Sequence, residues 1–154
     1  MGIGATLLIL GVSASPFAEL RAGLPLAVAR GYPAASAYVL AVAGNIAIVP
    51  VLLLGLEWAE RFFMRWRFTR TVMAWVFARA RRKGRWIERW GPVALILIVA
   101  IPLPGTGAWT GSLVARLLGI PPWKAFPWIV LGVLIAGGVV LAATLGAFHL
   151  SGIS

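Results

Sequence analysis

Two stretches of the chain carry no Lys, Arg, Asp or Glu over the length that a membrane-crossing helix needs. Ala34–Leu56 has 23 residues, and Phe126–Leu150 has 25, of which only His149 is ionisable. At 1.5 Å per residue, the two helices would reach about 34 and 37 Å, enough to cross a hydrocarbon core of about 30 Å with some tilt. The pattern therefore predicts two transmembrane helices, over residues 34–56 and 126–150.

Shorter apolar stretches precede each predicted span, and none of them can cross a bilayer alone. They hold 8 to 12 residues each and are Ile3–Ala14, Ala22–Ala29, Pro92–Ile101 and Ser112–Ile120. Each pair is joined by a polar or Gly/Pro-rich tip, at residues 15–21 and 102–107. Irregular backbone at membrane depth is tolerated only where protein or a wet cavity satisfies its polar groups. We therefore expect two re-entrant helical hairpins, over residues 3–30 and 92–120.

The two halves of the chain are related by a shift of 88 residues. Without any gap, this shift pairs five Gly or Pro residues with identical ones: Pro16/Pro104, Gly23/Gly111, Gly31/Gly119, Pro33/Pro121 and Gly44/Gly132. A unit of one hairpin and one span crosses the membrane once, so its second copy must be inverted. We predict an inverted repeat of residues 1–56 and 91–154, the architecture of many secondary transporters.

The segment between the two copies, residues 57–90, carries most of the charge. Ten of the 14 Lys and Arg residues lie between Arg61 and Arg89, and five of the eight Trp residues fall in this segment. Its apolar residues recur at spacings of three and four, which predicts an amphipathic helix. A basic, Trp-rich helix of this kind is typical of a membrane surface with anionic head groups. Its charge predicts that the segment is cytoplasmic and that both termini lie outside.

Composition excludes several classes of protein. With 61% hydrophobic and 12% charged residues, and a mean hydropathy of +0.95, the chain is too apolar for an ordinary soluble enzyme. The net charge of +10 is compatible with nucleic acid, but the aromatic residues share a stripe that a membrane would cover, so we expect no nucleic-acid partner. One His, no Cys and no Asp supply no metal cluster and no nucleophile triad. We therefore expect an all-α integral membrane protein with no enzymatic activity, metal or cofactor.

Glu19 is the only carboxylate outside the basic segment, and it lies at the first tip, two residues from Arg21. An ionisable residue at membrane depth is costly and is by default a functional candidate. One interpretation is a proton-coupling or cation-pairing carboxylate, with Arg21 as its partner or as an anion-binding group. The other is an ion pair that only neutralises the tip. The sequence favours the first, because both charges could have been omitted from so short a tip.

The second tip combines small residues, two hydroxyl groups and one aromatic ring. Its candidate binding residues are Pro104, Gly105, Thr106, Gly107, Trp109 and Thr110. Free backbone N–H groups at a broken helix bind anions or head groups, which is one interpretation of this tip. The other is close helix packing through Gly107 and Gly111. Arms of half a membrane's length from opposite faces predict that this tip meets Glu19 and Arg21 near the midplane.

Arg116 and Asn45 are polar residues within apolar stretches and complete the set of candidates. Arg116 either binds a phosphate or carboxylate group of a substrate or extends its side chain to the membrane interface. Asn45 is either an interhelical hydrogen-bonding residue or a substrate ligand. The sequence alone does not decide between these roles.

The segments Glu19–Pro25 and Pro102–Gly111 resemble the putative small multi-drug export protein family of prokaryotes, and the resemblance runs nearly end to end. That family is similar to the DedA (VTT-domain) membrane proteins, which share two opposed re-entrant hairpins and are implicated in moving lipids, including the undecaprenyl phosphate carrier. Glu19 matches the acidic residue of the first DedA hairpin. The arginines of the second DedA hairpin are missing, because Val99 and Gly105 stand at those places.

The resemblance implies a small transporter in the cell membrane of a prokaryote. It would move an amphipathic or lipid-like substrate through a cavity between the hairpins, with protons as the candidate coupling ion. We expect a homodimer, because two spans and two hairpins provide little helix to bury both tips. The alternative is a non-transporting protein that binds and organises anionic membrane lipid through its basic helix.

Overall fold

The computed structural model describes residues 2–63, 92–101 and 106–150, and the regular elements within these ranges are all helices. Two helices are long: α3 (Ala34–Phe63) and α8 (Pro122–Leu150). Four are short: α1 (Ile3–Ala14), α2 (Glu19–Ala29), α6 (Pro92–Ala100) and α7 (Ala108–Leu117). The all-helical prediction is confirmed for this part of the chain. Most of the predicted basic helix, residues 64–90, lies outside the described residues.

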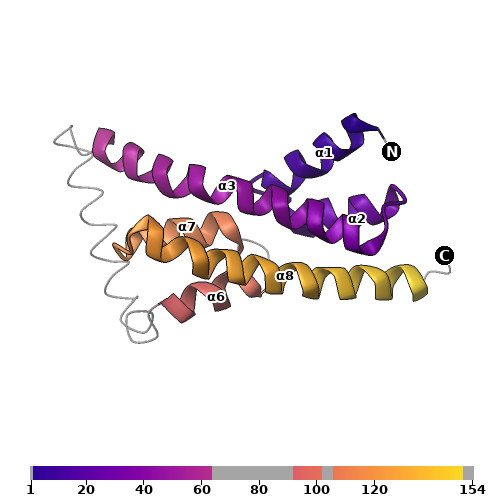
Figure 1. Cartoon of the computed structure of the whole chain (residues 1–154). Coiled ribbons are helices and arrows are strands. Elements are labelled where there is room, and N and C mark those ends of the chain that lie inside the picture. The colour runs from indigo at the N-terminus through magenta and orange to yellow at the C-terminus, as the bar shows by residue number, and fades with distance from the viewer. Residues whose placement is uncertain (1, 64–91, 102–105, 151–154) are drawn as a thin grey trace.

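The long helices α3 and α8 lie side by side, and the short helices pack against them as two hairpins (Figure 1). Helices α1 and α2 form one hairpin at the end of the molecule that carries both termini, and α6 and α7 form the other at the opposite end. The hairpins point toward each other, so their turns lie near the middle of the long helices. This arrangement brings together two tips that are far apart in the sequence.

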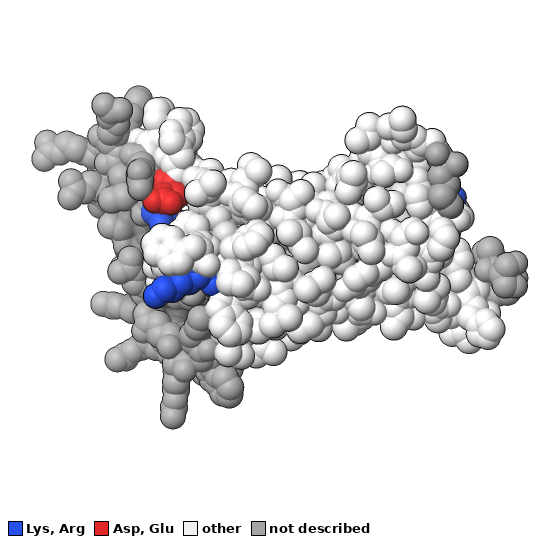
Figure 2. Space-filling model, in the orientation of Figure 1, with Lys and Arg blue, Asp and Glu red and all other residues white. Residues whose placement is uncertain are grey.

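Helices α3 and α8 have the length and composition to cross a membrane. Their segments Ala34–Trp58 and Pro122–Leu150 each reach a hydropathy of 2.5, with only 39% of the most apolar window buried. Large apolar side chains lie exposed on both helices, among them Val39, Val51 and Leu54 on α3 and Leu131, Leu134 and Ile135 on α8. On the face drawn in Figure 2, the charged side chains of the described residues show only toward the two ends of the molecule. These features make α3 and α8 candidate membrane-spanning helices.

The second arm of each hairpin begins earlier than the sequence pattern predicts. Helix α2 begins at Glu19 instead of Ala22, and α7 begins at Ala108 instead of Ser112. The pattern assigned polar and small residues to the tips, but the first turn of a helix also favours them. Its N–H groups have no acceptor in their own helix, and its dipole favours a carboxylate. The first tip is therefore shorter than predicted, and Glu19 is part of a helix.

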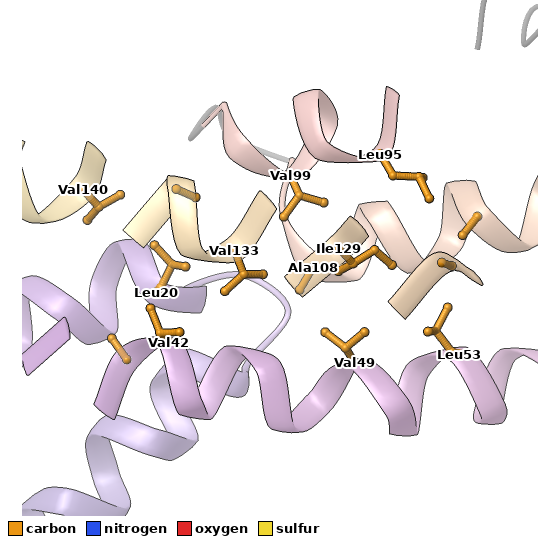
Figure 3. Close-up of a cluster of buried hydrophobic side chains, with 14 of the residues drawn as sticks. Leu20, Val42, Val49, Leu53, Leu95, Val99, Ala108, Ile129, Val133 and Val140 are labelled. Atoms are coloured by element: carbon orange, nitrogen blue, oxygen red, sulfur yellow. The ribbon is translucent and has the colours of Figure 1, made fainter. Parts of the chain in front are cut away.

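The hydrophobic core lies where α6, α7 and α2 meet the two long helices (Figure 3). It contains Leu20, Val42, Val49, Leu53, Leu95, Val99, Ala108, Ile129, Val133 and Val140. Glycines allow the helices to approach, because a Cβ on Gly132 would lie 2.6 Å from Val99 Cβ and one on Gly111 would lie 2.5 Å from Val99 Cγ2. Gly111 is therefore a packing residue, as one interpretation of the second tip predicted.

Candidate functional site

The two hairpin tips are joined by hydrogen bonds from the side chain of Arg21 on α2. Its guanidinium donates to the backbone carbonyl of Thr106 and, at 3.2 Å, to Thr106 Oγ1. Thr106 Oγ1 in turn donates to the carbonyl of Ile101, just beyond the end of α6, at 2.6 Å. Carbonyl groups at a helix end have no intrahelical partner. A carbonyl group just beyond the end of α6 is thus satisfied by Thr106 of the same tip, and Thr106 is in turn bonded by the opposite hairpin.

The Glu19 carboxylate caps the N-terminus of α7 from the other hairpin. Glu19 Oε1 accepts a hydrogen bond of 3.3 Å from the backbone N–H of Trp109, the second residue of α7. The residue at the N-cap position of α7, Gly107, has no side chain to do this. A carboxylate at this place also lies at the positive end of the helix dipole. One of the N–H groups expected to be free at this tip is therefore engaged by the protein's own carboxylate.

Gly107 makes this approach possible. Its φ of 142° lies in a region that favours glycine. A Cβ at this position would collide with Glu19 Oε2 and would lie 2.5 Å from the carboxyl carbon and 2.7 Å from Oε1. Any side chain on residue 107 would therefore push the Glu19 carboxylate away from α7.

The Glu19 carboxylate lies opposite the charge of Arg21 at the tip. The Glu19 residue is 5% exposed, and its Oε2 lies 3.9 Å from Nη2 of Arg21. The main chain of Glu19 has a φ of 47°, where residues with a side chain are uncommon. Backbone outliers of this kind cluster at functional positions. The carboxylate is thus held by a guanidinium, a helix N-terminus and a restrained backbone.

Trp109 forms the third link between the hairpins. Its indole Nε1–H donates to the carbonyl of Ala14, the last residue of α1, at 3.1 Å. The backbone N–H and the indole N–H of Trp109 therefore both bond to the first hairpin. In this structure Trp109 connects the two hairpins instead of lying free for a ligand.

The other predicted candidates lie at different places. Thr110 is half-buried in the first turn of α7, next to Trp109. Arg116 lies in the last turn of α7, about 12 Å along the helix from Ala108, so the structure does not bring it to the tips. Pro104 and Gly105 lie outside the described residues.

Asn45 lies in the middle of α3 and is 1% exposed. Its Oδ1 has no hydrogen-bond partner within the described residues. The neighbouring Gly44 packs against the Leu10 carbonyl and Ser13, in the second half of α1. Asn45 therefore lies at about the depth of the first hairpin tip, as a buried polar group with unused hydrogen-bonding capacity.

A groove of about 410 Å³ opens beside Arg21, between α2 and α8. Its lining residues are Arg21, Pro25, Val139, Val140, Ala143, Thr144, Ala147 and Phe148. From Val139 to Phe148 the wall follows α8 for about 13 Å, close to half the thickness of a hydrocarbon core. This wall is not apparent in the sequence pattern, because its residues are ordinary for a membrane span. The sequence signal that could have indicated this wall is the pair of small residues Ala143 and Ala147, one helical turn apart.

Comparison with protein families shows the family of this chain. A family model described as "Putative small multi-drug export protein" matches residues 19–139, more than half of the chain. The chain belongs to this family. The matched region of this small multi-drug export protein begins at Glu19 and includes all the described contacts between the tips except the Ala14 carbonyl. The comparison with curated proteins and the comparison with solved structures found no match.

The family and the apolar helices both indicate a membrane protein. The family description supports a membrane export role, and α3 and α8 have the features of spans. The family predicted from the sequence is therefore confirmed, whereas the relation to DedA proteins stays a prediction.

Proposed function

We propose that this member of the small multi-drug export family is a transporter that moves an amphipathic substrate along the groove beside Arg21 and past the contact between the hairpin tips. The observation that carries the proposal is the polar interlock, by which we mean the bonds that Glu19, Arg21 and Trp109 make across the two tips. A polar contact between the ends of two half-length hairpins has no structural equivalent in a simple helical bundle. It is the arrangement expected of a closed gate.

In a bilayer, the two hairpins would be re-entrant. Their helices have 9 to 12 residues and reach about 14–18 Å, half of the hydrocarbon core. The starts of α1, α2 and α3 precede those of α6, α7 and α8 by 89, 89 and 88 residues, which supports an inverted repeat. Transporters with such repeats bind substrate near the midplane at the repeat interface. In this chain, the polar interlock would lie at the interface between the two repeats.

Movement of a substrate requires the interlock to open. The groove ends at Arg21, and the bonds of Arg21 to Thr106 close the way past the tips. Each of these hydrogen bonds contributes about 0.5–1.5 kcal/mol net, and those to charged groups about 1.5–3 kcal/mol. A bound substrate must therefore replace some of them in the open state. Protonation of Glu19 would remove the charge that Arg21 and the start of α7 attract, and this is the proposed route of proton coupling.

The proposed orientation places the end of α3 and the start of α8 at the cytoplasmic interface. Trp58 stacks on Phe62 with ring centroids 5.7 Å apart, and it is 70% exposed. Trp123 is 73% exposed at the start of α8, beside the exposed Lys124. Aromatic and basic residues are enriched at membrane interfaces. We further propose a homodimer in a prokaryotic cell membrane, with both termini outside and membrane lipids as partners.

The test is movement of a fluorescent single-chain phospholipid between the leaflets of liposomes that contain the purified protein, followed by quenching of the outer leaflet. Wild type should accelerate the exchange, and Gly107→Leu should abolish it, because the leucine side chain would displace the Glu19 carboxylate and fill the space between the tips. Gly138→Leu is the matched control, because an added Cβ there meets no atom within 4 Å. Monodispersity of each variant in detergent shows that it is folded. Binding of the probe without movement would instead support a protein that only organises lipid.

A further inference from the structure

Arg21 is the charged residue among those that line the groove between α2 and α8. Within the described residues, only the Nη2 atom of its guanidinium is engaged, by Thr106 and by the nearby Glu19. A guanidinium has five N–H donors, so the groups on Nε and Nη1 remain for a ligand. The side chain is 25% exposed, which leaves room for contact from the groove.

The Glu19 carboxylate does not use up the charge of Arg21. Its Oε1 accepts from Trp109 N–H at 3.3 Å, whereas its Oε2 stays 3.9 Å from Arg21 Nη2 and forms no bidentate pair. The start of α7 contributes a further positive partial charge of about half a unit. Two positive groups therefore face one carboxylate, and the site as a whole retains attraction for a second, single negative charge.

The rest of the groove is apolar. Its α8 wall presents Val139, Ala143, Ala147 and Phe148, and the hydroxyl of Thr144 is already bonded to the Val140 carbonyl at 2.7 Å. A volume of about 410 Å³ is within the range of sites for small ligands. The wall is long enough for one alkyl chain that extends from the tip toward the end carrying both termini.

We propose that this groove binds a single-chain amphiphile with one negative charge. Its head group lies on Nε and Nη1 of Arg21, and its tail follows α8 toward Phe148. The inference rests on the proposed transport function and specifies its substrate class. The guanidinium of Arg21 would repel a cationic head group. A neutral head group would leave the N–H groups of Arg21 without a charged acceptor.

Equilibrium binding to the full chain in nanodiscs of zwitterionic lipid tests the inference. The probes are dodecanoate, dodecanol and dodecyltrimethylammonium, which share the tail and differ in the head. Arg21→Gln should weaken dodecanoate binding at least about tenfold and leave dodecanol binding unchanged. Arg30→Gln removes the same charge from the end of α2, outside the groove, and should change neither. Equal binding of all three probes to wild type, or equal losses for dodecanoate and dodecanol, would overturn the proposal.

A second variant keeps the test valid if Arg21→Gln fails to fold. Ala143→Phe fills the apolar wall at an exposed position without touching the tips, and it should abolish binding of dodecanoate and dodecanol alike. Nanodiscs with phosphatidylglycerol in place of zwitterionic lipid distinguish the source of the head group, because a bilayer lipid that occupies the site would compete with dodecanoate. Dodecanoate binding without any transport would refute the proposed function alone. Transport by the wild-type protein without any dodecanoate binding would refute only this inference.

Discussion

Gly107→Ala is the sharpest test of the contact between the tips. The substitution adds one methyl group where the Glu19 carboxylate lies against the backbone. Residue 107 has φ 142° and ψ −161°, a region that is essentially restricted to glycine, at a cost of about 1–3 kcal/mol for another residue. Displacing the carboxylate also removes its charged hydrogen bond from Trp109, which contributes about 1.5–3 kcal/mol. We expect Gly107→Ala to lower the free energy of unfolding by about 2.5–6 kcal/mol, the sum of the two effects.

The assay is reversible unfolding in mixed micelles, followed by helical circular dichroism. Gly138→Ala is the control with the opposite sign, because it lies in α8 with open space around an added Cβ. A glycine-to-alanine change within a helix should stabilise by about 0.5–1 kcal/mol. The two variants introduce the same atoms, so the difference between them reports the surroundings of residue 107.

A double-mutant cycle with Glu19→Ala separates the two causes. Once the carboxylate is gone, the methyl group on residue 107 meets no oxygen, and only the backbone strain of about 1–3 kcal/mol remains. Gly107→Ala should therefore cost less in the Glu19→Ala background, with a coupling energy above about 1 kcal/mol. Equal costs in both backgrounds would refute the assignment of Glu19 as the cap of α7.

Four further predictions address other parts of the molecule. Trp109→Phe keeps the ring but loses the indole bond to the α1 carbonyl, so the same unfolding assay should show a loss of about 1 kcal/mol. Glu19→Gln should abolish gradient-driven transport while the protein stays monodisperse, and an unchanged proton dependence would leave only the ion-pair role. Asn45→Leu should be neutral or stabilising in the unfolding assay, because it replaces a polar group whose oxygen has no partner; a clear loss would indicate a buried water or ligand there. A single cysteine at Gly84, in this cysteine-free chain, should resist impermeant thiol reagents in intact cells, and labelling from outside would reverse the proposed orientation.

Helix content and the lengths of the apolar stretches follow from the sequence alone. Ile3–Ala14 is found with the predicted bounds, and α8 begins only four residues before the predicted span. These properties are local, because they depend on runs of apolar side chains and on the rise of a helix. The predicted positions of the helix ends were less accurate, as at Glu19. A polar residue is compatible both with a loop and with the first turn of a helix.

Only the tertiary structure decided how the candidate residues act. The sequence predicted that the two tips meet, and its candidates included Glu19, Arg21, Thr106, Gly107 and Trp109. It did not show that Glu19 occupies the start of α7. The groove along α8 and the distant position of Arg116 were likewise undetermined. The physical reason is that these contacts join residues 85 to 127 positions apart. Which side chains meet at such separations depends on how whole helices pack, and small residues such as Gly107 and Gly132 set that distance.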